Sequence, residues 1–181
     1  MSPMSFKEHF TKEIKPALMK ELKCANVHAV PSFVKIVINV GAGEAVTNKG
    51  VIAKIQEQIG LIAGQKAVIT KARKSVSAFK IRQGLPIGVK VTLRGDKMYE
   101  FLQKLVTIVI PGFRDFRGIE PSVVDQHGNL NLGLTEQTLF PEIEYDKVDK
   151  VRGLQVTVVT TAKDKNEGMA LFQKLGIPFK K

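Results

Sequence analysis

A second cysteine, clustered histidines and long apolar runs are all missing from this sequence. The single cysteine, Cys24, excludes an internal disulfide and is typical of a reducing compartment. Three scattered histidines and one cysteine do not supply a structural zinc site, so we expect no metal. The longest apolar run, about Leu105 to Ile110, is far below the roughly 20 residues that span a bilayer. Charged residues interrupt the N-terminal region, which rules out an apolar signal-peptide core, and we expect a soluble intracellular protein.

Acidic residues are scarce as well, above all in one stretch. The 181 residues include 28 Lys and Arg against 17 Asp and Glu, a net charge of +11. A hydrophobic share of 44% indicates a folded core, so the excess charge favours a polyanionic partner, either nucleic acid or an anionic membrane surface. Between Gln65 and Lys97, nine basic residues accompany Asp96 alone, a local balance of +8. The nine are Lys66, Lys71, Arg73, Lys74, Lys80, Arg82, Lys90, Arg94 and Lys97.

The length of the chain predicts a single domain over residues 1–181, and hydrophobic periodicity predicts that it contains both helices and strands. In the N-terminal helix, within residues 1–24, Ser5 and Glu8 form a capping box, and Pro16 predicts a kink or a break. We expect a second helix ended by Gly64, a third capped by Asp96, and a last one that begins at Asp164 and ends at Gly176. Strands are expected at residues 33–40, 66–71, 87–94 and about 154–161.

Residues 111–141 break this regular pattern. Glycines and prolines punctuate the segment, so we expect long loops there, with a hairpin around Gly128 and Asn129. The resulting order of helices and strands differs from the regular alternation of a parallel fold. It favours an α+β fold with a mostly antiparallel sheet.

Two short patterns raise the alternative of an enzyme. Gly41 and Gly43 follow a strand and precede a helix, as in a dinucleotide-binding turn. Val46 takes the place of the third glycine and no ribose-binding acid follows at the required distance, so we favour a plain glycine turn and expect no cofactor. Cys24 and His28 could be imagined as a nucleophile pair, but an isolated cysteine is more often a small core residue. A nucleotide-dependent enzyme stays open as the alternative.

The main acidic stretch lies at residues 136–149. Paired carboxylates could carry out acid–base chemistry, but a solvated acidic loop is the simpler interpretation, and a basic protein partner would also fit. Its acids are Glu136, Glu142, Glu144, Asp146 and Asp149.

The basic stretch allows three interpretations. A solvated face normally mixes both charge signs, and a membrane face carries apolar side chains at helical spacing among the bases; this stretch has neither feature. Lys90, Thr92 and Arg94 instead share one strand face. The loop from Lys71 to Arg82 could overhang that face, and its Phe79 offers a ring on which an unpaired base can stack. Nucleic acid is therefore the favoured partner, with a peripheral membrane protein as a further alternative.

A series of motifs in the same region resembles a known family. The motifs are "INVGAGEA" (38–45), "GQKAVITKARKSVSAFKIRQGLPIGVKVTLRG" (64–95), "FRDFRG" (113–118), "FPEIEYDKVDKVRG" (140–153) and "TTAKDKNEG" (160–168). They look like the bacterial-type large-subunit ribosomal protein L-five family, which binds 5S rRNA, from about residue 5 to the C-terminus. The resemblance implies a non-enzymatic RNA-binding protein of the central protuberance, with a curved antiparallel sheet backed by helices.

The resemblance also implies roles for particular residues. The family's 5S rRNA surface matches Asn39, Gln65, Phe79 and Thr92, to which the basic strand adds Lys90 and Arg94. Asn and Gln bring donors and an acceptor, Thr a hydroxyl and Phe a stacking plane, all suited to RNA. The family's loop near the elbow of the P-site tRNA matches Lys71, Ala72, Arg73, Lys74 and Ser75. RNA phosphates would then supply the counter-charge that the basic stretch lacks.

Further partners follow from the same resemblance. The segment around Arg114 and Arg117 resembles the part that faces the small-subunit head across an intersubunit bridge, although Gly112 and "QHGNL" (126–130) carry fewer charges than the family pattern. Large-subunit rRNA and neighbouring central-protuberance proteins are also implied, and a membrane is not. The implied location is the cytoplasm, in the ribosome, with a plastid ribosome as the alternative.

Overall fold

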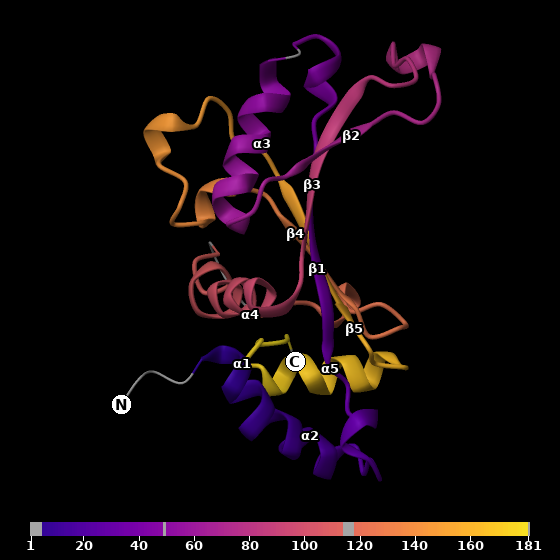
Figure 1. Ribbon diagram of the computed structural model, residues 1–181, viewed down its shortest axis with the longest axis vertical. Coiled ribbons are helices and arrows are strands. Elements are labelled where there is room, and N and C mark those ends of the chain that lie inside the picture. Colours follow the sequence, from indigo (N-terminus) through magenta and orange to yellow (C-terminus); the bar gives the residue numbers. More distant parts are fainter. Residues whose placement is uncertain (1–4, 49, 114–117, 181) are drawn as a thin grey trace. The chain divides into compact units, whose positions relative to one another are not determined.

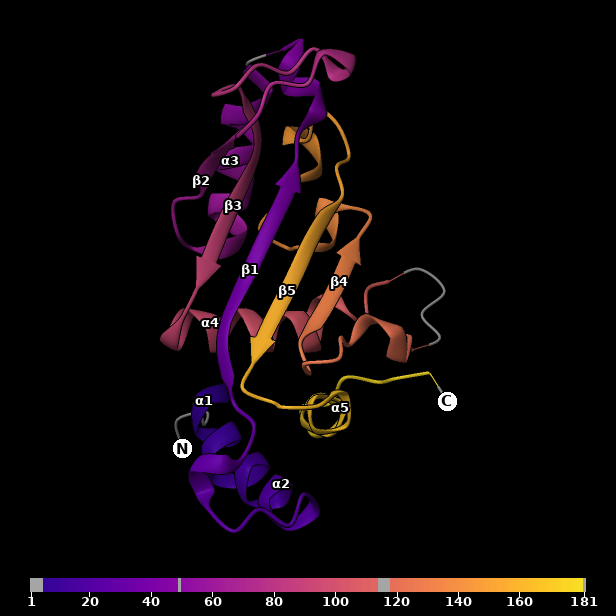
Figure 2. The same ribbon diagram turned by 90° about the vertical axis from the view of Figure 1, so that its right-hand side faces the viewer.

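Five strands form one antiparallel sheet in this computed structural model, which describes residues 5–48, 50–113 and 118–180 (Figure 1). The strand order is β2-β3-β1-β5-β4, and Figure 2 shows β3, β1, β5 and β4 running in alternate directions. The α+β class and the antiparallel sheet are therefore confirmed. The strands are β1 (Phe33–Gly41), β2 (Val68–Lys71), β3 (Pro86–Leu93), β4 (Leu130–Leu134) and β5 (Leu154–Thr160).

The α-helices lie before, between and after these strands along the chain, without regular alternation. They are α1 (Phe6–His9), α2 (Lys15–Glu21), α3 (Gly50–Ala63), α4 (Gly95–Lys104) and α5 (Lys165–Lys174). Two π-helical turns, Phe10–Ile14 and Leu105–Val109, continue α1 into α2 and extend α4.

The contacts between residues divide the chain into two compact units. Unit 1 contains Met1–Ile36, Arg94–Leu132 and Thr157–Lys181, and unit 2 contains Val37–Leu93 and Gly133–Val156. Strands β1, β4 and β5 each contribute residues to both units. The expectation that residues 1–181 form a single domain stays a prediction.

The N-terminal helix of unit 1 accommodates Pro16 without breaking. The Ser5 hydroxyl oxygen accepts a hydrogen bond from the Glu8 amide at 3.3 Å, as the capping box predicts. Just before Pro16 the backbone forms a π turn, in which the Lys15 amide donates to the Phe10 carbonyl five residues earlier. A π turn shifts the backbone hydrogen bonds by one residue, so the helix continues although proline has no N–H to donate. The predicted kink or break is therefore a local change of helical pitch.

Aromatic side chains fill the core of unit 1. The Phe33 ring at the start of β1 lies 5.2 Å from the Phe10 ring and 6.1 Å from the Phe172 ring of α5, measured between centroids. Tyr99 of α4 completes the cluster at 5.9 Å from Phe10. These three ring pairs are tilted, and Phe33 and Tyr99 also meet edge-on, as aromatic pairs prefer. They tie the N-terminal helix, α4 and α5 to the first residues of β1.

Two of the expected helix starts differ in detail. The residue before α4 is Arg94, and Asp96 lies inside the first turn, where its carboxylate accepts a hydrogen bond from Lys7 Nζ at 2.8 Å. The prediction that Asp96 caps this helix was wrong, because its carboxylate pairs with Lys7 of α1 instead. At α5 the N-cap residue is Asp164, as expected, but its side chain makes no capping hydrogen bond with a described residue. The Glu167 carboxylate instead accepts a hydrogen bond from the Lys163 amide at 2.9 Å.

The segment predicted as loops, residues 111–141, contains strand β4. Leu130, Leu132 and Leu134 are buried on one face of it, while Gly133 is exposed. Glycine and asparagine disfavour strands in isolation, so pairing in the sheet decides the conformation here. Before β4, the Asp125 carboxylate accepts from the amides of His127 and Asn129, and Val124 pairs with Leu130 around Gly128.

In unit 2 the apolar face of α3 packs against β3. Ile52, Ile55, Ile59 and Ile62 of α3 are all buried, as are Val89, Val91 and Leu93 of β3. Gly64, with φ +58°, ends the helix in the left-handed conformation expected of a C-terminal glycine. One face of the strands in this unit is therefore closed by α3.

Gly88 on β3 permits a close approach between neighbouring strands. A Cβ atom at this position would lie 2.7 Å from the Val40 carbonyl oxygen of β1 and 2.9 Å from the Thr70 hydroxyl of β2. The substitution Gly88→Ala should therefore lower the free energy of unfolding by about 1–3 kcal/mol, because main-chain atoms must shift to admit the methyl group. Urea denaturation measures this loss.

Gly133→Ala is the matched control for this prediction. Gly133 is also a strand glycine of unit 2, and nothing lies within 4 Å of the place where its Cβ would stand. Its unfolding midpoint should stay at or slightly above the wild-type value. Equal stability of the two variants would contradict the packing role of Gly88.

Candidate nucleic-acid interface

Strand alternation leaves the second sheet face of unit 2 uncovered. The side chains of Ile38 and Val40 on β1 and of Val89 and Val91 on β3 are buried on the α3 side, so their neighbours in sequence point the other way. In Figure 1, α3 lies on one side of β1, β2 and β3, and no helix among the described residues of this unit covers the other side. We call this uncovered side the open face; its members on β1, β2 and β3 are Val37, Asn39, Gly41, Val68, Thr70, Gly88, Lys90 and Thr92.

The open face brings several of the expected RNA-binding residues together. Asn39 and Lys90 are exposed and Thr92 is half-buried. Gln65, exposed just beyond α3, donates from Nε2 to the Thr92 carbonyl oxygen at 3.4 Å. Arg94 is exposed directly after β3. Gln65, Thr92 and Arg94 thus lie at the end of the β2–β3 pair away from the basic loop, while Asn39 lies near the end of β1, which runs in the opposite direction to β3 (Figure 2).

The basic loop, residues 71–82, continues the hairpin formed by β2 and β3. The Ala72 amide donates to the Leu85 carbonyl at 2.8 Å, and Val76 and Ile81 exchange a pair of backbone hydrogen bonds. The Ser75 hydroxyl oxygen accepts from the Gln83 amide at 2.9 Å. The loop is therefore an ordered extension of the strands. Lys71, Arg73 and Lys74 are exposed on it.

Phe79 lies at the tip of this extension, apart from the other expected residues. A short 3-10 turn, Ser77–Phe79, ends at Lys80, whose φ of +55° reverses the chain. The Phe79 side chain is 71% exposed. Gln65 precedes β2 and Phe79 follows it, so the two residues stand at opposite ends of the hairpin. The structure therefore separates a stacking ring at the tip from the polar group around Thr92.

The cations of this region have no acidic partner in the described part of the chain. Eight of the nine basic residues between 65 and 97 form no ion pair with any residue in 5–48, 50–113 or 118–180, and all eight are exposed. The eight are Lys66, Lys71, Arg73, Lys74, Lys80, Arg82, Lys90 and Arg94. Like charges held this close raise the energy of the isolated protein and attract a polyanion.

Three described cations elsewhere in unit 2 are paired with carboxylates: Lys54, Lys150 and Arg152. Arg152, a buried side chain, donates from Nη1 and Nη2 to the two carboxylate oxygens of Asp149, at 2.8 and 3.2 Å. Lys54 lies 3.7 Å from the same carboxylate, and Lys150 lies 3.2 Å from Glu44. The hydrogen bonds from Arg152 lower the pKa of the Asp149 carboxyl to about 2. The acidic stretch is therefore partly neutralised within the protein, unlike the basic stretch.

Because of this pairing, unit 2 should become less stable as the pH falls into the acid range. Because the pKa of Asp149 falls from 3.8 when unfolded to about 2 when folded, its contribution is complete above about pH 5 and disappears as the pH falls through 2. Asp149→Asn should cost about 1–2 kcal/mol at pH 7, a value reduced by partial exposure of the carboxylate, and almost nothing at pH 2. Urea unfolding of both proteins from pH 2 to 7 measures the difference; a difference independent of pH would contradict the ion pair.

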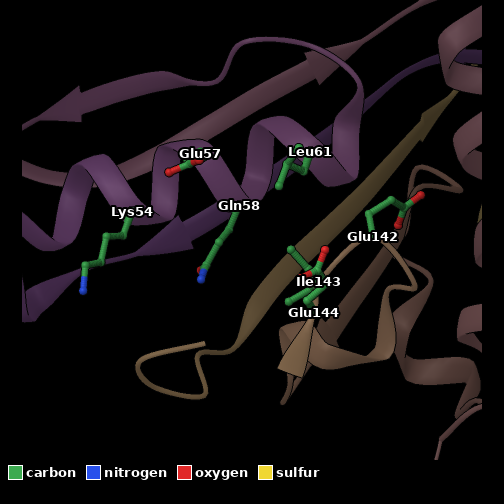
Figure 3. A pocket seen from close by; sticks show the side chains of 7 residues that line it. All are labelled: Lys54, Glu57, Gln58, Leu61, Glu142, Ile143 and Glu144. Atoms are coloured by element: carbon green, nitrogen blue, oxygen red, sulfur yellow. The ribbon is translucent and has the colours of Figure 1, made fainter. Parts of the chain in front are cut away.

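A pocket of about 250 Å³ lies on the α3 side of unit 2 (Figure 3). It is lined by Lys54, Glu57, Gln58 and Leu61 of α3 and by Glu142, Ile143 and Glu144 of the acidic stretch. Three carboxylates against one ammonium group repel phosphate. The pocket is therefore unsuited to RNA, and the open face and the basic loop are the candidate interface.

The enzyme patterns find little support in the structure. β1 ends at Gly41, and a short 3-10 turn, Gly43–Val46, stands where a dinucleotide site would place a long helix. The Cys24 thiol lies 3.9 Å from the Leu22 carbonyl oxygen, and His28 is exposed. Within residues 5–48, 50–113 and 118–180, no three His, Cys, Asp or Glu side chains gather in a way that could hold a metal ion. The helices of that same part of the chain are all too short or too polar to cross a membrane.

Sequence reasoning missed Val68 and Thr70 as members of the open face. Val68 stands directly opposite Lys90 in the β2–β3 register, and Thr70 stands opposite Gly88. Val68 is 58% exposed, although it is apolar. The signal was present in the alternation of β2, but a four-residue strand is too short to fix its register from sequence.

The fold and this surface define a class of protein: a small basic α+β protein whose sheet face and hairpin expose the polar and cationic side chains that suit nucleic acid. Two family models match the chain, one described as "Ribosomal protein L5" over residues 26–82 and one for the C-terminus of the same ribosomal family over residues 86–179. The chain therefore belongs to the ribosomal protein L5 family.

Relatives in this family match the chain over nearly its whole length. The large ribosomal subunit protein uL5 of Geobacter sp. (strain M21) is 53% identical over 96% of this chain and 97% of its own length. The uL5 protein of Thermosipho africanus (strain TCF52B) is 52% identical over 100% of both chains. A large ribosomal subunit protein uL5c from Tetradesmus obliquus is 49% identical over 96% of both chains.

Family membership settles the general role. The protein is a structural, RNA-binding constituent of the large ribosomal subunit that takes part in translation, and it is not an enzyme. Its partners include ribosomal RNA, and its location is the ribosome. The expected cytoplasmic location agrees with this role, and the uL5c relative keeps a plastid ribosome as the alternative.

Proposed function

We propose that this protein binds 5S rRNA through the open face of unit 2 and helps to attach that RNA to the central protuberance. The observation that carries the proposal is the combination on one surface of exposed polar groups with cations that have no acidic partner in the described chain. Asn39, Gln65 and Thr92 would contact bases and 2′-hydroxyls, while Lys90 and Arg94 would contact phosphates. A flat strand face suits this task, because its side chains project in parallel from a rigid main chain.

The basic loop has a separate part in the proposal. Lys71 at the end of β2, with Arg73, Lys74 and Ser75 beyond it, would approach the elbow of the P-site tRNA. Backbone hydrogen bonds already order the loop, so binding RNA would cost little further conformational entropy. Phe79 at its tip would stack on an unpaired base of 5S rRNA.

Other partners are proposed from the family resemblance. They are large-subunit rRNA, neighbouring proteins of the central protuberance, and a protein of the small-subunit head. The residues that suggested the last of these, Arg114 and Arg117, lie outside the described residues. No membrane is included.

The direct experiment compares 5S rRNA with an unrelated structured RNA of similar length over a range of salt concentrations. Specific recognition predicts that 5S rRNA binds more tightly by orders of magnitude and keeps this advantage as the salt concentration rises. If both RNAs bind alike and dissociate together, only the net charge is recognised and the proposal fails. Adding NAD, ATP or GTP in a thermal-shift assay tests whether the Gly41–Gly43 turn binds a nucleotide, and cosedimentation with anionic vesicles near physiological salt tests membrane binding.

Single substitutions on the open face test the residues. Asn39→Ala and Thr92→Ala should each weaken 5S rRNA binding by about 1–3 kcal/mol, because a polar group of the RNA is left without its partner. The affinity is measured by filter binding or fluorescence anisotropy. Gln173→Ala, an exposed amide on α5, is the control and should bind like the wild type. Wild-type affinity in the Asn39 and Thr92 variants would remove these residues from the site.

Charge reversal in the loop should separate folding from binding. Arg73→Glu combined with Lys74→Glu should change the free energy of unfolding by no more than about 0.5 kcal/mol, because both side chains are exposed and unpaired in the described chain. Arg152→Glu, a reversal at a buried and paired position, should cost about 3–5 kcal/mol. Urea denaturation measures both. A large loss of stability in the loop variant would show that the loop supports the fold.

A further inference from the structure

Gly41 is a glycine that the fold itself does not require. Nothing lies within 4 Å of the place where its Cβ would stand, and its φ is not in the left-handed region. An alanine at this position would therefore meet no atom of the protein. In a strand, a glycine weakens the structure relative to alanine, because it loses more conformational freedom on folding. A reason for this glycine must be sought outside the folded chain.

The position of Gly41 on the open face suggests the reason. It is exposed at the end of β1, two residues after Asn39, so both residues face the same side of the sheet. Its Cα lies 3.7 Å from the point where a Cβ of Gly88 would stand on the neighbouring strand β3. The main chains of β1 and β3 are thus bare next to each other on this face.

Polar groups surround this bare main chain. The Thr70 hydroxyl lies 2.9 Å from the same Cβ point of Gly88, and Lys90 follows Gly88 by two residues on the same strand face. Gly88 needs no further explanation, since the Val40 carbonyl oxygen excludes a side chain there. Gly41 has no such neighbour. It is the one residue of β1 without a side chain, so a ligand on the open face can reach the main chain there, next to Gly88 and two residues from Asn39.

We infer that a ribose–phosphate segment of RNA lies directly against the main chain of Gly41, and that the missing side chain sets how closely the RNA approaches. This inference rests on the proposed function and names a positioning residue within its binding face. Lys90 would neutralise the phosphate of that segment, and Asn39 would contact the adjoining nucleotide. A methyl group at position 41 would hold the RNA away from both side chains while leaving the protein intact.

The experiment uses the full chain with Gly41→Ala and Gly41→Ser, and Gly133→Ala as the control. Gly133 is another open-space strand glycine of unit 2, but β4 carries no basic residue. We expect the urea midpoint of Gly41→Ala to stay at or above the wild-type value while its affinity for 5S rRNA falls at least tenfold. The serine variant should lose affinity similarly, and Gly133→Ala should bind within twofold of the wild type.

Each other outcome is decisive. If wild-type protein prefers 5S rRNA to the unrelated RNA and Gly41→Ala binds as tightly as wild type, the inference is overturned and the proposed function stands. If Gly41→Ala lowers the urea midpoint clearly, the fold requires this glycine and the inference is overturned as well. Equal losses in the Gly41 and Gly133 variants would also remove the special role of Gly41. If the wild type itself shows no preference for 5S rRNA, the proposed function fails, and this inference fails with it.

Discussion

The packing of α3 against one face of the strands in unit 2 is the constraint on which the functional surface depends. Because side chains alternate along a strand, burial of Ile38, Val40, Val89 and Val91 beneath α3 sends every second side chain to the opposite side. A shift of one residue in register would bury Lys90 and expose the core. The hydrophobic effect thus orients the polar residues of the open face, although none of them takes part in the core.

Basic residues are neutralised in one part of unit 2 and, within the described chain, left unneutralised in another. Around Arg152 the protein supplies its own counter-charges, and the pairing holds the chain between β4 and β5 close to Glu44 and α3. In the β2–β3 hairpin it supplies none within the described residues, and backbone hydrogen bonds from Ala72 to Leu85 hold the cations in place against their mutual repulsion. The first arrangement stabilises the free protein, and the second leaves positive charge that attracts a polyanion.

Much of this could be predicted from the sequence, for identifiable reasons. The β1 and β3 strands and α3 have long, regular apolar patterns, and the glycine at position 64 ends its helix as expected. The basic stretch needed only a count of charges. Strand β4 was missed because Asn131 and Gly133 weaken its pattern, and the role of Asp96 was missed because its partner, Lys7, is distant in sequence. The separation of Phe79 from Thr92 also required the structure, since only the extended hairpin shows that the two lie at different ends.

The interleaving of the two units bears on how the chain is made. Each unit is assembled from segments that the other unit interrupts, and each needs residues from the last part of the sequence: Gly133–Val156 for unit 2 and Thr157–Lys181 for unit 1. During synthesis from the N-terminus, the early strands β1, β2 and β3 must therefore wait for β5 before the sheet is complete. Such long-range pairing folds slowly compared with local contacts. Until β5 is made, β1 has an unpaired edge beside a hairpin that is dense in positive charge, and an unpaired strand edge is open to pairing with other chains.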